Sequence, residues 1–378
     1  MRRWKRIIQG FLRKLLDYLP KICYTCGWEG CALRNYVLYN QDQPVARFSV
    51  ETGVIASYVP THPELLPMQI RAASPEGFTL WLQNRAMDLS SFQHRQLAQA
   101  LVGSRDKISV ALLTHMFSIS DTFTCFATDE PFVSRSQLCL PDQQNRVSDF
   151  ILVSNDTSLR LARISSPNAS TDGSFTKTWR FENNHWWLYK LQSADATRSE
   201  YEISRALRKA GFDAAEYRMD HSRKTRIRTR NFVGEDEFFE PYESLRYMFK
   251  DLSDSDDVIY ANLASLGETF EHAWRRILLS DALFMNTDRH MRNFGGIRSA
   301  RTGELKRLAP NFDNNQAYKA NPGNHYSSGM LNAFRAAYGL TQADRDELRA
   351  LLSACEERAY MLDAVEVGTD FLKQIKEN

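Results

Sequence analysis

Residues 281–294 read Asp-Ala-Leu-Phe-Met-Asn-Thr-Asp-Arg-His-Met-Arg-Asn-Phe, and Pro-Asn-Phe-Asp follows at 310–313. Four residues separate Asp288 from Asn293, and Asp313 comes after a strand-like segment. Phosphoryl transfer from a metal-bound nucleotide needs one acid near the attacking hydroxyl. It also needs an amide oxygen and a second carboxylate that hold magnesium against the phosphates. An Asp-x-x-x-x-Asn pair on a tight loop points both side chains to one side, so this stretch predicts a shared phosphate site.

The apolar run from Trp274 to Met285 has helical spacing, so we expect the loop to follow the end of a helix. Asp, Asn, Arg and His also gather in ordinary solvated loops, where Asp and Asn make their own turns. The pair alone therefore leaves both interpretations open. The motifs around it favour the catalytic one.

Asp-Arg-His-Met-Arg-Asn at 288–293, followed by Leu-Ala-Pro-Asn-Phe-Asp at 308–313, resembles the catalytic core of HipA-like serine/threonine kinases. Phosphatidylinositol kinases share a similar Asp-Arg-His-x-x-Asn loop. The resemblance implies that Asp288 is the catalytic base and that Asn293 and Asp313 bind magnesium. Arg289 and His290 would shape the loop or face the phosphates, or have a purely structural role.

A small, polar stretch runs from Ser165 to Thr178 and becomes strand-like at Trp179. Such a loop can present backbone N–H groups to phosphate, with Gly173 allowing close approach, although similar stretches are often ordinary loops. The resemblance places it at the phosphate loop, with Gly173 and Ser174 as nucleotide-binding residues. It also implies autophosphorylation on a loop serine such as Ser174. With one glycine, the loop departs from the glycine-rich pattern of eukaryotic kinases.

His185 to Leu191 predicts an apolar strand that carries Lys190 near its end, where a buried lysine is costly unless it is paired. Ser199 to Gly211 has a cap, helical apolar spacing and a terminal glycine, so it predicts a helix. Glu200 in its first turn could reach Lys190, as the strand lysine and helix glutamate of kinases do. The alternative is a snorkelling Lys190 and a solvated Glu200. By the resemblance, Lys190 orients phosphates, and Glu200 fits the family spacing better than Glu202.

Two predicted strands, at 214–219 and 225–232, would finish the small lobe. Alternating arginines on the second indicate a solvated edge or help in neutralising phosphates. They do not indicate a nucleic-acid groove, because few aromatic residues lie between them. By the resemblance, Phe232 falls at the adenine-contacting hinge.

The amino-terminal residues 1–34 combine helically spaced apolar residues with arginine and lysine. This pattern allows an anchor on an anionic membrane surface, a helix docked on the protein itself, or a leader. Cys23, Cys26 and Cys31 suit zinc or a redox turn, but no fourth zinc ligand follows at the usual spacing. The other cysteines are expected to be buried thiols, which are typical of a reducing cytoplasm. They are Cys125, Cys139 and Cys355.

The segment from Asn35 to Phe126 predicts short strands and helices that carry no chemistry of their own, and Lys107 is expected to be a surface charge. Strands are expected at 36–39, 44–48 and 54–55, and helices at 92–101 and 108–117. Pro131 and Pro141 indicate a connector over 128–148. Helices are also expected at 330–338, 342–355 and 359–374.

The chain has 378 residues and a formal net charge of +2, so composition favours neither nucleic acid nor membrane as a partner. The sequence contains no run of about 18 apolar residues, so it predicts no membrane-spanning helix. We predict an α+β, two-lobed kinase-like fold with an amino-terminal accessory region. The predicted parts are a leader (1–34), an accessory region (35–148), a small lobe (149–245) and a helical lobe (246–378).

The resemblance implies an ATP- and Mg²⁺-dependent phosphotransferase in the cytoplasm that acts on Ser or Thr of a protein substrate. It also implies an antitoxin-like partner of a toxin–antitoxin system. Two other functions stay open, namely a nucleotide-binding pseudokinase and a kinase for a lipid or small-molecule hydroxyl.

Overall fold

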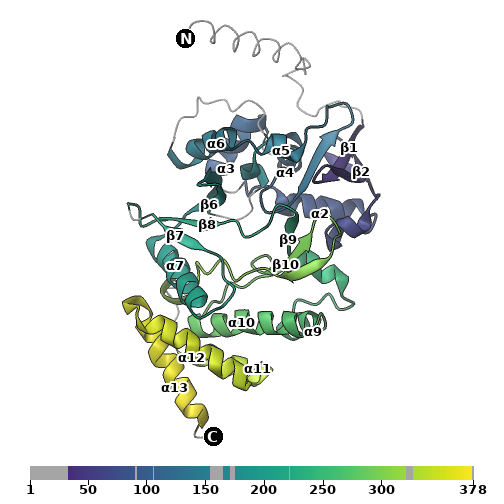
Figure 1. Cartoon of the computed structure of the whole chain (residues 1–378). Coiled ribbons are helices and arrows are strands. Elements are labelled where there is room, and N and C mark those ends of the chain that lie inside the picture. Colours follow the sequence, from purple (N-terminus) through teal and green to yellow (C-terminus); the bar gives the residue numbers. More distant parts are fainter. Residues whose placement is uncertain are drawn as a thin grey trace.

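The computed structural model describes residues 33–89, 92–104, 106–153, 165–170, 175–220, 222–320 and 327–376. The predictions for the leader, with Cys23, Cys26 and Cys31, and for Gly173 and Ser174 fall outside these residues. The described residues stack as an accessory part, a small sheet with one long helix, a second small sheet, and a helical end (Figure 1).

The accessory part is built on an antiparallel sheet of order β3-β2-β1-β4. Alternating buried residues point into a core in which Tyr36 stacks on Phe48 and Tyr58 stacks on Phe78. Its strands are β1 (Arg34–Asn40), β2 (Gln43–Glu51), β3 (Val54–Pro60) and β4 (Phe123–Ala127). Its helices are α2 (Pro75–Arg85), α3 (Phe92–Val102), α4 (Lys107–Leu113), α5 (Arg135–Leu138) and α6 (Pro141–Val153), with 3₁₀ turns η1 (Pro63–Leu65), η2 (Met68–Ile70) and η3 (Pro167–Ser170).

The small lobe is an antiparallel sheet of order β5-β6-β8-β7 beside the long helix α7 (Ala194–Lys209). Ser193 caps α7, because its side chain accepts a hydrogen bond from the backbone N–H of Ala196. Gly211, with φ of +79°, follows the end of the helix. The strands are β5 (Thr176–Glu182), β6 (His185–Leu191), β7 (Tyr217–Met219) and β8 (Arg226–Arg230).

A third antiparallel sheet, of order β11-β10-β9, joins the accessory part to the helical end. Phe238 of β9 and Ala300 after β10 belong to the same buried cluster as the accessory sheet. Asn40 Nδ2 of β1 donates to the Ala300 carbonyl at 2.9 Å. The strands are β9 (Glu237–Pro241), β10 (Gly295–Ser299) and β11 (Leu305–Leu308). The accessory part and this sheet therefore share one core.

The helical end packs around α10 (Glu268–Phe284), and α7 contributes Ile203 and Leu207 to the same core. The other helices are α8 (Tyr242–Leu245), α9 (Asp256–Ala264), α11 (Gly329–Tyr338), α12 (Gln342–Glu356) and α13 (Leu362–Lys376). The 3₁₀ turns are η4 (Arg246–Met248), η5 (Tyr318–Ala320) and η6 (Ala359–Met361).

The predicted two-lobed, kinase-like α+β fold is confirmed. The connector expected over 128–148 is wrong, because α5 and α6 occupy most of it. The helix expected from Ser199 is longer than predicted and begins at Ala194. The domain boundaries at 34/35, 148/149 and 245/246 stay predictions.

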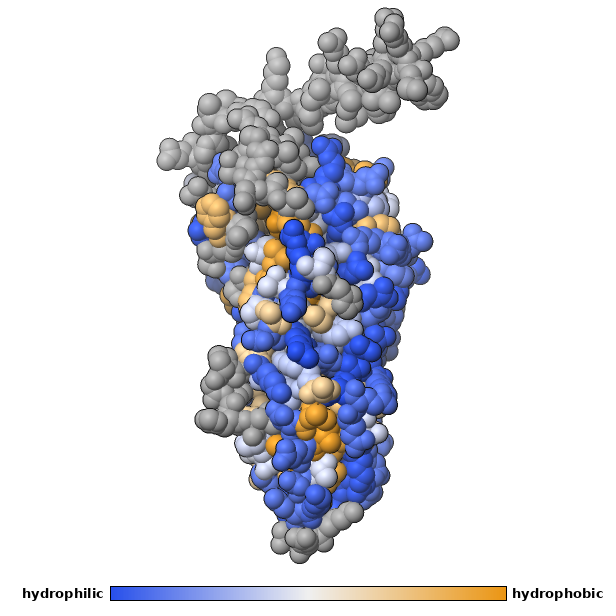
Figure 2. Space-filling view, turned by 90° about the vertical axis from the view of Figure 1, so that its left-hand side faces the viewer, coloured by the Kyte–Doolittle hydropathy of each residue, from blue (hydrophilic) through white to orange (hydrophobic). Residues whose placement is uncertain are grey.

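One face of the molecule is mostly hydrophilic, with hydrophobic side chains in separate patches (Figure 2). Among the described residues, no helix combines the length and the apolar character that crossing a membrane requires.

Candidate active site

Lys190, near the end of β6, lies between two carboxylates. Its Nζ is 2.7 Å from Glu200 Oε1 of α7 and 2.7 Å from Asp313 Oδ1, which follows β11. Lys190 is 3% exposed and Glu200 is fully buried. Gln192 Nε2 donates to the other oxygen of Glu200 at 2.9 Å, so both carboxylate oxygens have a donor. The pair expected between Lys190 and Glu200 is thus present, and Asp313 joins it.

Burial and charge act in opposite directions on this cluster. Burial disfavours the charged form of Lys190, but the neighbouring charges of Asp313 and Glu200 outweigh it, and the pKa of Lys190 lies well above its usual value. Burial also disfavours an ionised Asp313, yet Lys190 and Lys177 hold the pKa of Asp313 far below its usual value. Both groups therefore carry their charges at neutral pH.

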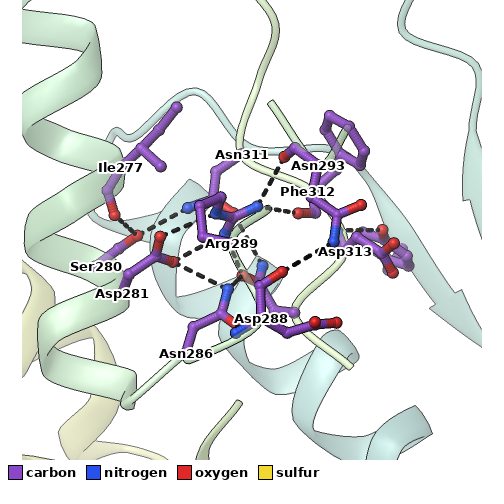
Figure 3. Close-up of polar contacts among 12 residues, drawn as sticks. Ile277, Ser280, Asp281, Asn286, Asp288, Arg289, Asn293, Asn311, Phe312 and Asp313 are labelled. Atoms are coloured by element: carbon purple, nitrogen blue, oxygen red, sulfur yellow. Dashed lines mark hydrogen bonds and ion pairs between the residues drawn. The ribbon is translucent and has the colours of Figure 1, made fainter. Parts of the chain in front are cut away.

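The loop that carries Asp288 and Asn293 begins where α10 ends, at Met285, which adopts the left-handed conformation with φ of +49°. Arg289 ties this loop to its surroundings (Figure 3). Its guanidinium donates to both oxygens of Asp281, at 2.8 and 2.9 Å. It also donates to the carbonyls of Asn293 and Phe312, at 2.9 and 2.6 Å. Arg289 therefore shapes the loop, one of the roles that the sequence allows.

The Arg289–Asp281 pair is buried, each side chain being 7% exposed. Burial lowers the pKa of Arg289, but Asp281 more than compensates and the pKa is raised. Asn311 and Asn314 side-chain oxygens accept further hydrogen bonds from the same guanidinium. A fully engaged planar guanidinium of this kind cannot be replaced by lysine without loss.

Asp288 and Asn293 lie on this loop. Hydrogen bonds within the loop fix the backbone at Asp288 and the side-chain amide of Asn293. The Asp288 N–H donates to Asn286 Oδ1 at 3.2 Å. Asn293 Nδ2 donates to the Asp288 carbonyl at 3.1 Å, which fixes the amide and turns its oxygen the other way. Asp288 is half-buried, and within the described ranges its carboxylate makes no hydrogen bond or ion pair. Its oxygens are therefore not committed to another residue of the described ranges.

Asp288, Asn293 and Asp313 line one cavity of about 630 Å³. This volume lies within the usual range for small-molecule sites. The cavity lining also includes Lys177, His290, Arg292, Phe312 and Asn315. The accessory region contributes another part of the lining, here called the accessory wall, which includes Pro67, Gln69, Trp81, Asn84, Arg85, Asp88, Lys107, Ser120, Asp121 and Phe123.

Sequence analysis missed Lys177, which pairs directly across from Lys190 in the β5–β6 ladder and faces the cavity. Its charge helps to depress the pKa of Asp313. The strand alternation from Trp179 back to Thr176 is the signal that could have found it, since residues opposite each other on paired strands share a sheet face. Lys107 also lines the cavity, although the sequence predicted an ordinary surface position.

Phe232 follows β8 and packs against Phe239 and Phe312, with ring centroids 6.0 and 5.4 Å apart. Phe239 and Phe312 both line the cavity. An adenine contact by Phe232 stays a prediction. Glu202, which the sequence ranked below Glu200, is paired with Arg358.

The donor set fits magnesium carried by a nucleotide better than a metal held by protein alone. Within the described ranges, no three or more His, Cys, Asp and Glu side chains form a metal-binding group. Asn293 and Asp313 instead offer an amide oxygen and a carboxylate on one cavity wall. Magnesium usually takes one or two carboxylates and completes its shell with phosphate oxygens and water. Asn293 and Asp313 therefore fit Mg²⁺ whose other ligands are phosphate oxygens and water.

Models of known protein families give no match to this sequence, and neither do curated proteins. Among solved structures, a chain of the Shewanella oneidensis MR-1 toxin–antitoxin complex of HipA, HipB and operator DNA matches 89% of this chain and 97% of its own. The TM-score is 0.57 and the sequence identity is 11%. The Helicobacter pylori proinflammatory kinase CtkA matches 50% of this chain and 81% of its own, with a TM-score of 0.37 and 16% identity. The first likeness shows that the chain has a HipA-like fold.

Proposed function

We propose that this protein is an ATP- and Mg²⁺-dependent phosphotransferase that phosphorylates Ser or Thr of a protein. The single observation that carries the proposal is the gathering of Asp288, Asn293 and Asp313 on one cavity, with Lys190 bonded to Asp313 at 2.7 Å. These groups come from three separate segments of the chain. An ordinary solvated loop would give no reason for these three segments to meet at one cavity.

Each residue has a defined task in this proposal. ATP with Mg²⁺ supplies the phosphoryl group when bound. Asn293 and Asp313 would hold the metal, while Lys190 and Lys177 bind phosphate oxygens. Glu200 keeps the Lys190 ammonium in place, and the carboxylate of Asp288 accepts or orients the proton of the acceptor hydroxyl. Gly173 and Ser174 would contribute to the phosphate loop.

Asp288→Asn tests the assignment, because the amide keeps the shape of the side chain and removes the base. We expect incorporation of label from radiolabelled ATP to fall about 100-fold or more. Binding of ATP with Mg²⁺, followed by thermal shift, should remain. Asp254→Asn, a conservative change in the exposed loop before α9, is the control. Equal incorporation by wild type and Asp288→Asn would contradict the proposed base.

The matched Shewanella oneidensis structure is a complex of a toxin–antitoxin system with its operator DNA. We therefore also propose a protein partner of antitoxin type for this chain. Its test is co-purification with the protein encoded beside it. Purification of this chain alone, with the neighbouring protein expressed but unbound, would count against such a partner.

A further inference from the structure

Lys107 occupies the accessory wall of the cavity, half-buried at the first position of α4. Within the described ranges it makes no hydrogen bond or ion pair. A cation in the first turn of a helix is opposed by the helix dipole. A half-buried charge with no partner also carries a desolvation cost. The position of this lysine is therefore not explained by stabilisation of the fold.

The other charged side chains of the cavity are engaged. Asp88, Lys177 and Arg292 have partners of their own. The remaining acids, apart from Asp288, are held in pairs. The pairs are Asp121 with Arg85 at 2.6 Å, Glu240 with Arg298 at 2.8 Å, Glu243 with Asn84 at 3.0 Å, and Asp313 with Lys190 at 2.7 Å. Among the described residues, Asp288 and Lys107 are thus the two charged groups of this cavity without a partner.

These two groups line the same cavity. Asp288 is on the loop that follows α10, and Lys107 belongs to the accessory region. An acceptor whose hydroxyl reaches Asp288 enters this cavity, where side chains of the accessory region are within its reach. We propose that Lys107 binds a carboxylate of the acceptor polypeptide, so that the enzyme prefers Ser or Thr beside an acidic residue. This inference rests on the proposed function and adds a substrate class to it.

A lysine suits this task because its ammonium is a compact charge on a flexible stem, which tolerates several positions of the carboxylate. The same ammonium could instead meet phosphate oxygens of the nucleotide. If Lys107 binds the acceptor carboxylate, the affinity for the peptide depends on it. If Lys107 binds the nucleotide phosphates, the affinity for ATP depends on it, and the experiment measures both.

The experiment measures equilibrium binding of fluorescent Ser-containing hexapeptide pools to the full chain by anisotropy. One pool has Asp and Glu beside the serine, and the other has Asn and Gln. The proteins are wild type, Lys107→Gln, Lys107→Arg, and Lys250→Gln as the control, which removes one charge from an exposed position away from the cavity. Binding of a fluorescent ATP analogue is measured on the same samples, as is label transfer from ATP to each pool.

We expect wild type to bind the acidic pool about tenfold more tightly than the neutral pool, the value of one charge-assisted contact. Lys107→Gln should lose that preference, Lys107→Arg should keep most of it, and Lys250→Gln should match wild type. Affinity for the ATP analogue should be the same in all four.

Equal binding of both pools by wild type, binding of neither pool, or an unchanged preference in Lys107→Gln would overturn the inference. A fall in ATP affinity with the pool preference intact would assign Lys107 to the nucleotide instead. If both pools bind with equal affinity and accept label at equal rates, the proposed kinase activity stands. The proposed preference for acidic neighbours is then removed.

Discussion

Lys190 is buried between two carboxylates, and its charge is the reason that Asp313 stays ionised. Asp313 itself has φ of +61°, a left-handed backbone conformation that aspartate tolerates better than most residues. Its N–H donates to the hydroxyl of the buried Tyr217 at 3.1 Å. The conformation and this hydrogen bond together turn the carboxylate towards Lys190 and the cavity.

Asp313→Asn should lower the free energy of unfolding by about 1.5–3 kcal/mol at neutral pH, the usual value of a hydrogen bond to a charged group. Because burial opposes the Asp313 charge while Lys190 and Lys177 favour it and depress its pKa, this contribution is complete above the ordinary value of 3.8. As pH falls through the folded-state pKa, the carboxylate is protonated and the contribution disappears. Urea unfolding of both proteins between pH 7 and pH 3 measures the difference.

The charge of Lys190 makes the stability of the protein depend on pH in the alkaline range. Burial opposes its charge, but Asp313 and Glu200 raise its pKa, so its contribution is present below 10.5 and lost as pH rises through the folded-state pKa. Lys190→Met should therefore remove the alkaline dependence, and it should also change the acid dependence, because Asp313 loses the main cation that depresses its pKa. A gap between wild type and Asp313→Asn that stays constant down to pH 3 would contradict the assignment.

Some site residues could be predicted from the sequence and others could not. Asp288 and Asn293 share one short loop, and Lys190 lies in a strand whose apolar neighbours indicate burial, so local pattern sufficed. Lys107 reaches the cavity because the accessory region packs against the β9–β11 sheet, and Lys177 reaches it because β5 pairs with β6. No local pattern encodes the packing that places Lys107, whereas the alternation along β5 indicates the sheet face on which Lys177 lies.

At the scale of elements, helix starts were harder to predict than helix faces. Pro141 indicates a connector in the sequence, yet it begins α6, because the first turn of a helix does not need the N–H that proline lacks. Pro75 begins α2 in the same way, behind the cap Ser74. The apolar spacing is clearest from Ser199 and predicts that α7 begins there. The structure instead has Ser193 as the cap of this helix.

Ser193→Ala should lower the free energy of unfolding by about 1 kcal/mol, because the N–H of Ala196 loses its acceptor. Thermal unfolding detects the loss, and hydrogen exchange should be faster in the first turn of α7. Ser193→Asp keeps an acceptor and is the control. A melting temperature of Ser193→Ala equal to that of wild type would show that the cap contributes nothing.

At the scale of the whole molecule, the accessory part is locked to the β9–β11 sheet by buried polar contacts. Glu240 of β9 accepts a hydrogen bond from the Met68 N–H at 2.5 Å and pairs with Arg298 at 2.8 Å. Glu240 is 1% exposed and Arg298 is 4% exposed. Gly303 closes the β10–β11 turn against the backbone of Glu64. The accessory part is therefore held firmly against the β9–β11 sheet.

Gly303→Ala should destabilise the protein by about 1–3 kcal/mol beyond the cost of its left-handed backbone, because a Cβ there would lie 1.8 Å from the Glu64 carbonyl oxygen. Gly53→Ala is a matched control, since Gly53 has φ of +81° and nothing within 4 Å of an added Cβ. Chemical unfolding compares the two, and hydrogen exchange at η1 and η2 should rise only in Gly303→Ala. Equal destabilisation by both changes would remove the proposed lock.

The hydrogen bond from Asn40 to the carbonyl of Ala300 joins residues 260 positions apart. A ribosome builds the strand that carries Asn40 early and reaches Ala300 only much later, at a rate of about 5–20 residues per second. During that interval the nascent amino-terminal sheet lacks Phe238 and Ala300, two residues that complete its interior. Translation that stops short of Ala300 would therefore release a fragment with an unfinished core, which chaperones or proteases would have to remove.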